Sequence, residues 1–320
     1  MFFTGERLLR EEFSANPESA STAIAVLEAK VGARTDRGRV RENNEDRVLV
    51  FDLNRGLALA TEEMAVAELQ PLGVLLVVAD GMGGMAAGEQ ASQLCIEQLP
   101  GNLLKRLSQA NAASPPGRAS REERRQALDE AVRQTHQCIY VHASADAGLR
   151  GMGTTLTAAL LEENCLYVAQ VGDSRAYLGR GSDLRQLTRD QTVWETFRQE
   201  TQHSAPALGK APWKNMLMQA LGAQAEIQVA ITETALEPGD WLLLCTDGLH
   251  RAVAPEEIGA VMAAESNPAE KAFELVGLAN LHGGPDNVSV IVCQLANHSG
   301  PARRGGQARG ATGARSRAGR

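Results

Sequence analysis

The sequence predicts an α+β protein in which helices cover an antiparallel sandwich of strands. Two observations indicate this class: short strand patterns follow one another as a meander, and the helical patterns occur in separate pairs instead of alternating with single strands. A chain of 320 residues with 43% hydrophobic residues can bury a substantial core. We therefore expect a soluble globular protein.

The first part of the domain contains three strand patterns. Residues 24–33 end at the turn-forming segment Thr-Asp-Arg-Gly at 35–38, and residues 48–53 form the second pattern. Residues 73–79 are a continuous apolar run, which is typical of a strand buried on both faces. Residues 54–72, between the second and third patterns, are predicted to be an insertion.

Two long helices are predicted next. Apolar residues recur at helical spacing from Ala87 until Pro100-Gly101, which should end the helix. After a loop at residues 111–120, a second amphipathic pattern includes Leu128 and runs to about His142.

The period then changes to that of an antiparallel meander, with strands at residues 154–161, 165–171 and 175–179. Residues 191–217 lack a clear period, so we expect an irregular, flap-like surface segment there. The domain closes with strand, helix, helix and strand patterns at residues 241–245, 255–264, 269–280 and 288–295.

The ends of the chain differ in composition from this domain. Residues 1–21 are predicted to be a polar extension, and residues 297–320 an Arg/Gly-rich disordered tail. Residues 301–320 contain six arginines and no acidic residue. This tail is interpreted either as an end without a role or as an electrostatic arm for an acidic partner. The domain itself is predicted to span residues 22–296.

Charge and cysteine content exclude several classes of protein. A net charge of -7 disfavours a general nucleic-acid binder, which needs clustered Lys and Arg. The five cysteines include no Cys-x-x-Cys pair, which indicates reduced thiols and neither disulfides nor a zinc site. The sequence contains no signal-peptide core and no apolar run of about 18 residues. We therefore expect a cytoplasmic protein without a membrane segment.

Four acidic positions stand out because each abuts a predicted strand and lies in a turn with Gly or Asn: Glu45-Asp46, Asp80-Gly81, Asp247-Gly248 and Asp286-Asn287. A single Asp in such a turn is usually turn chemistry, but a set of four at strand ends can converge on one point. Carboxylates without His or Cys partners select Mg²⁺ or Mn²⁺. Two such ions can activate water against a phosphoester while an Arg binds the phosphate oxygens.

These segments closely resemble the bacterial branch of the PP2C (PPM) phosphatases. The matching segments appear in the family's order and at family-like spacing within residues 22–296, at 35–38, 41–46, 77–84, 151–156, 171–177, 187–190, 219–222, 238–240, 245–249 and 283–288. The resemblance implies a four-layer α-β-β-α sandwich, in which two antiparallel sheets are flanked by helices and two divalent cations, Mn²⁺ or Mg²⁺, bind at one end.

The resemblance also implies roles for particular residues. Asp80 would bridge the two metals, with the carbonyl of Gly81 as a further ligand. Asp247 and Asp286 would complete the coordination of the first metal, and Asp46 would serve the second.

Arg41 would hold the phosphate of the substrate. Further acids lie outside this core set: Glu45, where related sequences often carry Gln, and three residues interpreted as loop anchors, Asp36, Asp173 and Asp190.

The activity implied by the resemblance is hydrolysis of phosphoserine and phosphothreonine in proteins, without a covalent intermediate. The expected partners are phosphorylated proteins, either a bacterial Ser/Thr kinase or its substrates. No nucleic acid and no membrane are expected to bind, and the protein is expected to be a monomer. The alternative is a catalytically weak phosphatase-like module that binds phosphoproteins.

The sequence departs from the family pattern at three places. Residue 82 is Met, where eukaryotic members carry a His. An acid that binds a third metal in some relatives is absent before residue 152, and Asp146 is out of register with it. Gln191-Thr192 replaces the usual His-Ser at the start of the flap-like segment.

Parts of this sequence also match motifs of two other enzyme classes. Residues 81–86 resemble a dinucleotide-binding fingerprint, but Asp80 would repel the pyrophosphate. The spacing from Cys245 to Arg251 matches that of cysteine-dependent phosphatases, but Asp247 would lie inside the phosphate loop. The histidines are expected to be non-ligands, with His250 and His282 as supports behind the metal ligands.

Overall fold

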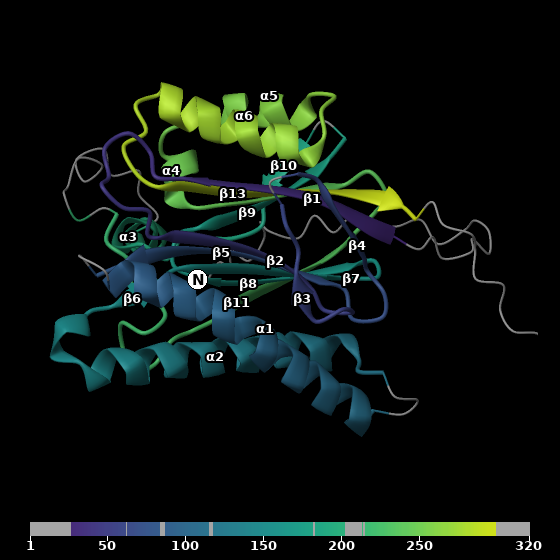
Figure 1. The fold of residues 1–320 in the computed structure, drawn as a ribbon, viewed down its shortest axis with the longest axis horizontal. Helices are drawn as coiled ribbons and strands as arrows, with labels where there is room; N and C mark the ends of the chain where they lie inside the picture. The colour runs from purple at the N-terminus through teal and green to yellow at the C-terminus, as the bar shows by residue number, and fades with distance from the viewer. Residues whose placement is uncertain are drawn as a thin grey trace, which may run out of the picture.

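Helices and sheets form four layers in the computed structural model, which describes residues 27–61, 63–83, 87–114, 118–181, 183–201, 213 and 215–298. Within these residues the strands form two antiparallel sheets that pack face to face. Helices cover the outer face of each sheet (Figure 1). The predicted α-β-β-α sandwich is therefore confirmed.

The first sheet has the strand order β10-β9-β12-β13-β1-β4. In that order the strands have the bounds Asp183–Gln186, Arg175–Arg180, Trp241–Cys245, Val288–Asn297, Leu27–Asp36 and Ala65–Glu68. Strand β13 pairs with β1 along the full length of both, from Asp36 opposite Val288 to Leu27 opposite Asn297. The two ends of the domain thus lie together in the centre of this sheet.

The second sheet has the strand order β11-β8-β7-β5-β2-β3, and β6 pairs with β5 beside this path. In that order the strands have the bounds Ala230–Ala235, Cys165–Val171, Leu156–Glu162, Val74–Met82, Asp46–Asp52 and Leu57–Ala58, and β6 is Gly153–Thr154.

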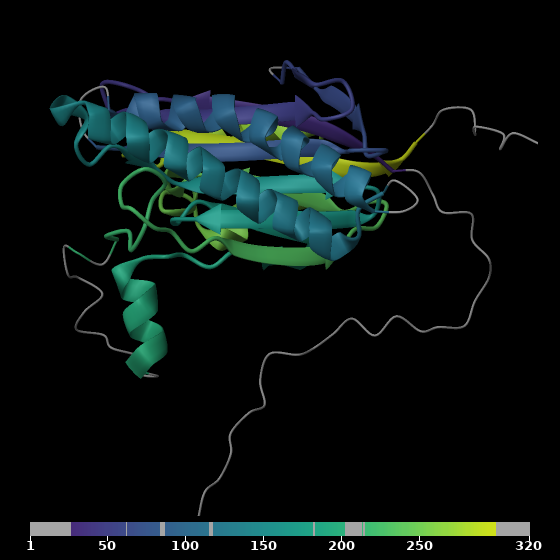
Figure 2. The same cartoon turned by 90° about the horizontal axis from the view of Figure 1, so that it is seen from below.

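Two helix pairs complete the layers. Helices α1 (Ala87–Ala113) and α2 (Arg121–Ala145) cover the second sheet, and α5 (Pro255–Ala263) and α6 (Pro268–Leu281) cover the first (Figure 1). Helix α3 (Val193–Thr201) projects from the sandwich in Figure 2, where α1 and α2 lie side by side. The short elements α4 and η1 have the bounds Asp247–His250 and Ala147–Leu149. None of the described helices combines the length and apolarity needed to cross a membrane.

The surroundings of strand β5 explain why its side chains are apolar on both faces. Leu75, Val77 and Ala79 pack with α1 and α2, and the alternate residues pack between the two sheets. Side chains of a strand point to opposite faces in turn, so a strand between a helix layer and a second sheet buries every position. The prediction of a buried strand at residues 73–79 is confirmed.

The predicted end of the first long helix at Pro100-Gly101 is wrong, because α1 continues to Ala113. A proline inside a helix removes one backbone hydrogen bond. Leu99, Leu103 and Leu107, on the turns around Pro100, are fully buried against the second sheet and α2. Their burial offsets the loss, since each buried leucine contributes about 2 kcal/mol.

Two segments for which no element was predicted contain regular structure. The insertion at residues 54–72 supplies an edge strand to each sheet, β3 and β4. The flap-like segment 191–217 contains α3, and its residues 202–212 and 214 lie outside the described residues. The short strands β10 and β11 were not predicted, because each is an edge strand with little apolar alternation.

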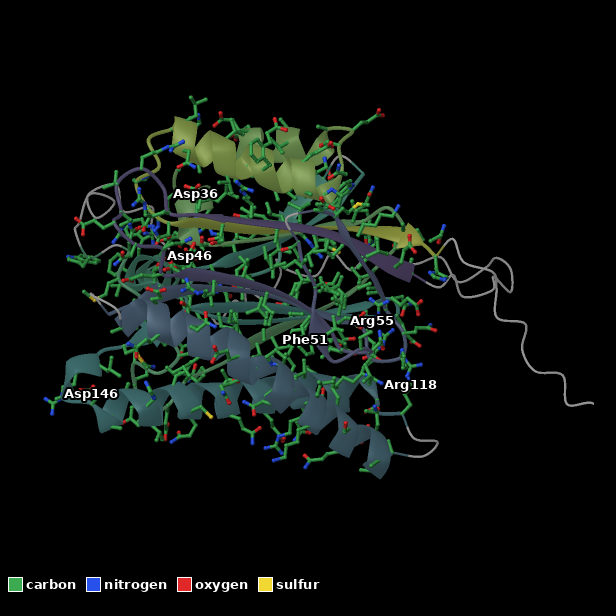
Figure 3. All side chains as sticks on the ribbon, viewed as in Figure 1. Asp36, Asp46, Phe51, Arg55, Arg118 and Asp146 are labelled. Atoms are coloured by element: carbon green, nitrogen blue, oxygen red, sulfur yellow. The ribbon has the colours of Figure 1, made fainter. Side chains whose placement is uncertain are left out.

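The predicted terminal extensions, residues 1–21 and nearly all of 297–320, lie outside the described residues. Strand β1 begins at Leu27 in the described part and extends three residues beyond the predicted end, to Asp36. The longer strand brings the loop that contains Arg41 to the same end of the sandwich as Asp46. Figure 3 shows Asp36 and Asp46 near this end, with Phe51 and Arg55 toward the other.

Candidate metal centre

The four acidic positions converge at one end of the sandwich. Asp46 is the first residue of β2 and lies directly opposite Asp80 of β5. Asp247 begins α4 one residue after β12, and Asp286 precedes β13. Because β12 and β13 are neighbours in the first sheet, and β2 and β5 in the second, each sheet contributes two acids.

A cavity of about 680 Å³ lies among these residues. Its wall contains five of the predicted site residues: Arg41, Asp80, Gly81, Asp247 and Asp286. Asp46 is not part of the wall, because it is almost fully buried behind it, with 1% of its surface exposed. The structure thus brings together every residue of the predicted set.

Asp46 connects the two sheets below the cavity. Its Oδ2 accepts a hydrogen bond from Thr246 Oγ1 at 2.8 Å, and the backbone N–H of Ser289 donates to the same hydroxyl at 3.0 Å. Its other carboxylate oxygen, Oδ1, is buried without a hydrogen-bond partner among the described residues. Burial is the main cause that raises the pKa of Asp46 to about 7, and repulsion from Asp247 adds to it.

The carboxyl groups of Asp80 and Asp247 also have raised pKa values. Burial raises the pKa of Asp80 well above its ordinary value, and the charges of Asp46 and Asp247 raise it further. Burial also raises the pKa of Asp247, although the charge of Arg251 opposes the shift. Like charges in a site of low dielectric resist ionisation, so the cluster requires cations to be fully charged at neutral pH.

Two arginines line the cavity, and each binds a predicted metal ligand. Arg41 Nη2 lies 2.7 Å from Asp286 Oδ2. Arg251 Nη1 lies 2.6 Å from Asp247 Oδ2, and its Nη2 lies 2.6 Å from Asp173 Oδ2. In this arrangement, no three His, Cys, Asp or Glu side chains of the described residues surround one point as metal ligands. Two of the carboxylate oxygens that an ion would use are paired with these arginines instead.

The donor set nevertheless fits a hard divalent cation. It consists of carboxylates and contains no His or Cys side chain. The unpartnered buried oxygen of Asp46 and the raised pKa values of Asp46 and Asp80 both indicate a missing positive charge.

The backbone of Asp80 is fixed by the residues that follow the glycine-rich segment at 151–153. Its N–H donates to Thr155 Oγ1 at 3.0 Å, and its carbonyl accepts from the Thr155 N–H at 2.8 Å and from Thr154 Oγ1 at 3.0 Å. Such supporting bonds hold a ligand in one orientation.

Asn287 is a functional residue that the sequence analysis did not single out. It is buried, and its Oδ1 accepts from the Glu45 N–H at 2.8 Å. Its Nδ2 donates to the carbonyls of Arg37 at 2.9 Å and Asn43 at 2.8 Å. These bonds hold both ends of the loop that contains Arg41. An amide directly before a largely apolar strand was the available sequence signal.

The glycine after Asp247 is required by packing. A Cβ at Gly248 would collide with the backbone carbonyl of Asn287, so α4 and the start of β13 can approach only with glycine here. This contact fixes the spacing between the turns of Asp247 and Asp286.

The three acids interpreted as loop anchors have different partners. Asp36 accepts from the Gly38 N–H at 2.9 Å, which confirms a turn anchor, and Asp190 is held by Arg175 through two hydrogen bonds of 2.8 and 2.6 Å. Asp173 instead lines the cavity and binds Arg251, so its interpretation as only a loop anchor is wrong. Burial raises its pKa to about 7, and repulsion from Asp247 adds to this.

Glu45 and Asp146 lie outside the carboxylate cluster in different ways. Glu45 is half-buried and lines the cavity, with its side chain against Gly88 of α1. Asp146 is exposed and accepts from the Gly148 N–H at 2.8 Å, as the cap of η1. It does not line the cavity, and Figure 3 shows it at the end of α2.

No histidine of the described residues lines the cavity, and His250 contacts a residue that does. His250 Nε2 is 3.1 Å from the backbone carbonyl of Asp173, and burial lowers its pKa to about 4, so it is neutral near pH 7. His282 Nδ1 lies 2.9 Å from the carbonyl of Ala252.

The structure excludes the two rival enzyme classes. Cys245 is fully buried in β12, and burial raises its pKa to about 12, so it is not a nucleophile. Strand β5, which leads into the glycine-rich segment, pairs antiparallel with both β2 and β7. A dinucleotide-binding unit requires parallel strands joined by a helix.

Comparisons with known proteins identify relatives of this chain. The model of the family described as Protein phosphatase 2C matches residues 64–276. The "Serine/threonine phosphatase stp" of Listeria monocytogenes is 33% identical over 261 residues, which cover 82% of this chain and 94% of that protein.

Solved structures show the same likeness. The Mycobacterium tuberculosis serine/threonine phosphatase PstP/Ppp has a TM-score of 0.66 and 36% identity, covering 85% of this chain and 100% of that one. The catalytic domain of PstP in complex with two manganese ions has a TM-score of 0.62 and 34% identity, covering 84% of this chain and 99% of that one.

Proposed function

The chain belongs to the protein phosphatase 2C family and is therefore a metal-dependent serine/threonine protein phosphatase, for which we propose a role for each predicted site residue. The observation that carries this proposal is the convergence of Asp46, Asp80, Asp247 and Asp286 from two sheets, with one buried oxygen of Asp46 unpartnered among the described residues. We propose that these four aspartates and the carbonyl of Gly81 hold two divalent cations, Mn²⁺ or Mg²⁺.

The position of each aspartate indicates which ion it would bind. Asp80 lies opposite Asp46 in the second sheet, and the charges of both Asp46 and Asp247 repel it, so Asp80 would be the ligand shared by the two ions. Asp247 and Asp286 serve one ion, and Asp46 serves the other. When bound, the ions lower the pKa of water and neutralise charge at the phosphoester.

Arg41 is the residue proposed to bind the substrate's phosphate. Its side chain is 55% exposed at the cavity, and Asn287 fixes the loop around it. The guanidinium fork can make two parallel hydrogen bonds to phosphate oxygens. The same group pairs with Asp286, so we propose that Arg41 exchanges this carboxylate for the phosphate.

The substrates are phosphorylated proteins. We further propose that a bacterial Ser/Thr kinase, or the proteins it phosphorylates, is the partner, and that the phosphatase acts as a cytoplasmic monomer. The catalytic domain is proposed to span residues 22–296, with residues 191–217 as a flap beside the cavity, to whose wall Asn215, Met216 and Leu217 contribute.

Hydrolysis of a phosphothreonine peptide tests this function. We expect activity with Mn²⁺, no activity with excess EDTA, and a loss of at least 100-fold, on the order expected for a lost ligand, in Asp80→Asn and Asp247→Asn. Activity that survives EDTA would contradict the metal mechanism. Phosphopeptide binding without turnover under every condition would instead identify a catalytically weak binding module.

A further inference from the structure

Arg251 joins two carboxylates across one side of the cavity. Its Nη1 lies 2.6 Å from Asp247 Oδ2, and its Nη2 lies 2.6 Å from Asp173 Oδ2. Asp247 is a proposed metal ligand, whereas Asp173 has no part in the proposed two-ion centre. One guanidinium therefore links the centre to a carboxylate outside it.

Asp173 is almost fully buried, and contacts to its backbone turn fix its position. Only 3% of its surface is exposed, and it lines the cavity. The turn around it is held by His250, which contacts the Asp173 carbonyl at 3.1 Å, and by Gln191, whose N–H donates to the Gly172 carbonyl at 3.0 Å. The carboxylate of Asp173 is therefore held away from solvent, and a buried carboxylate requires a positively charged partner.

The position of Arg251 is set by α4. Its backbone N–H donates to the carbonyl of Asp247 at 2.9 Å, so the guanidinium and the ligand belong to one helical turn. An arginine is protonated at every physiological pH and its planar fork spans two carboxylates. Two buried carboxylates that face one cavity would otherwise select a hard divalent cation.

We propose that the guanidinium of Arg251 occupies a cation site formed by Asp173 and Asp247, and so keeps a further divalent ion out of the cavity. This inference rests on the proposed two-ion centre. Arg251 is in this sense a positioning residue: it balances Asp173, restrains Asp247, and leaves the other oxygen of Asp247 for the centre.

Metal counting tests this assignment. Titration calorimetry of Mn²⁺ into the metal-stripped full chain is expected to give two ions for the unaltered protein and three for Arg251→Gln. Arg251→Lys keeps a positive charge between the two carboxylates and is expected to stay at two. The double variant Arg251→Gln with Asp173→Asn loses the carboxylate pair and is expected to return to two.

Thermal denaturation provides a second readout. Arg251→Gln leaves a buried carboxylate unpaired, so its melting temperature should rise with Mn²⁺ by more than that of the unaltered protein. If this variant does not fold without metal, Arg251→Ala purified in Mn²⁺, with the ions counted by native mass spectrometry, should also contain three. Failure of both variants to fold even in Mn²⁺ would count against the inference, because the ion should replace the guanidinium.

Two failures can be told apart. An unaltered protein that does not bind two ions would overturn the proposed centre, whatever the variants do. Two ions in both the unaltered protein and Arg251→Gln would overturn the role of Arg251 alone. So would a third ion that persists in the double variant, because that ion would not use Asp173.

Discussion

Arg41 and Arg251 line the same cavity, yet their partners assign them different tasks. Arg41 has one carboxylate partner, at 2.7 Å, and lies on a loop whose neighbouring residues 42 and 43 are exposed. Arg251 has two carboxylate partners, and one of them is almost fully buried. A singly paired, exposed guanidinium can move to a substrate at small cost, whereas a doubly paired one cannot.

Substitution of Arg41 should therefore affect substrate handling. We expect Arg41→Ala to lower kcat/KM by about 10- to 100-fold, because it removes charge-assisted hydrogen bonds to the phosphate. Arg41→Lys keeps the charge but not the fork, so its kcat/KM should lie between the two. Steady-state kinetics on a phosphothreonine peptide provides the measurement.

Metal binding is the control for this variant. Arg41→Ala frees Asp286, so the affinity for Mn²⁺ should not fall. Unchanged kcat/KM in Arg41→Ala would show that Arg41 does not contact the phosphate.

At the scale of elements, helix α5 is held to α6 by a buried lysine. Lys271 Nζ donates to the carbonyls of Val261 and Met262 at 2.8 Å and of Ala264 at 2.5 Å. These carbonyls belong to the end of α5, where a positive charge is favourable. The ammonium group also lies 4.4 Å from the ring centre of Trp241, which connects the helix pair to β12.

Lys271→Met should destabilise the fold by about 2 kcal/mol, because the hydrogen bonds to the helix end are lost while the apolar stem is kept. Urea denaturation measures this change. The exposed Lys105 on α1 offers a matched control, since Lys105→Met should change stability by less than about 0.5 kcal/mol. Phosphatase activity of the folded Lys271→Met protein should be unchanged, and equal stabilities of the two variants would contradict the prediction.

Local sequence patterns predicted those elements whose form depends on local chemistry. The apolar run at 73–79 is one example, and the amphipathic pattern of the second long helix is another. The continuation of α1 through Pro100 could not be predicted in this way, because the leucines that compensate for it are buried by β5 and α2. The edge strand β4 likewise depends on a partner far away in the chain, because it pairs with β1, with Glu28 opposite Glu68.

At the scale of the whole molecule, the two sheets together create a buried concentration of negative charge. Burial raises the pKa of both Asp46 and Asp173 to about 7. In the unfolded chain these carboxyl groups have pKa values near about 4. The folded protein thus binds protons that the unfolded chain has lost, so stability is greatest below the unfolded pKa and is lost as the pH rises through about 7.

The metal-free protein should consequently melt at a lower temperature as the pH rises from about 5 to about 8. Saturating Mn²⁺ should weaken this dependence, because the cation replaces the protons. Thermal denaturation in EDTA and in Mn²⁺ at each pH is the measurement. Asp46→Asn, which removes one of the raised carboxyl groups, should flatten the EDTA curve. A melting temperature that rises with pH in EDTA would contradict the charge cluster.

The sequence by itself determined the identity and order of the acidic turns and the layered α+β architecture. These follow from residue type and short-range periodicity, and the candidate ligands could be predicted because each abuts a predicted apolar strand. The structure places Asp46 in β2, Asp80 in β5 and Asp247 in α4, where turns were expected. Tertiary structure decided which groups bind one another. Asn287 contacts Asn43 across 244 positions, and Arg251 contacts Asp173 across 78. Such pairs arise only when the sheets pack, because no local pattern records which buried carboxylate will face which cation.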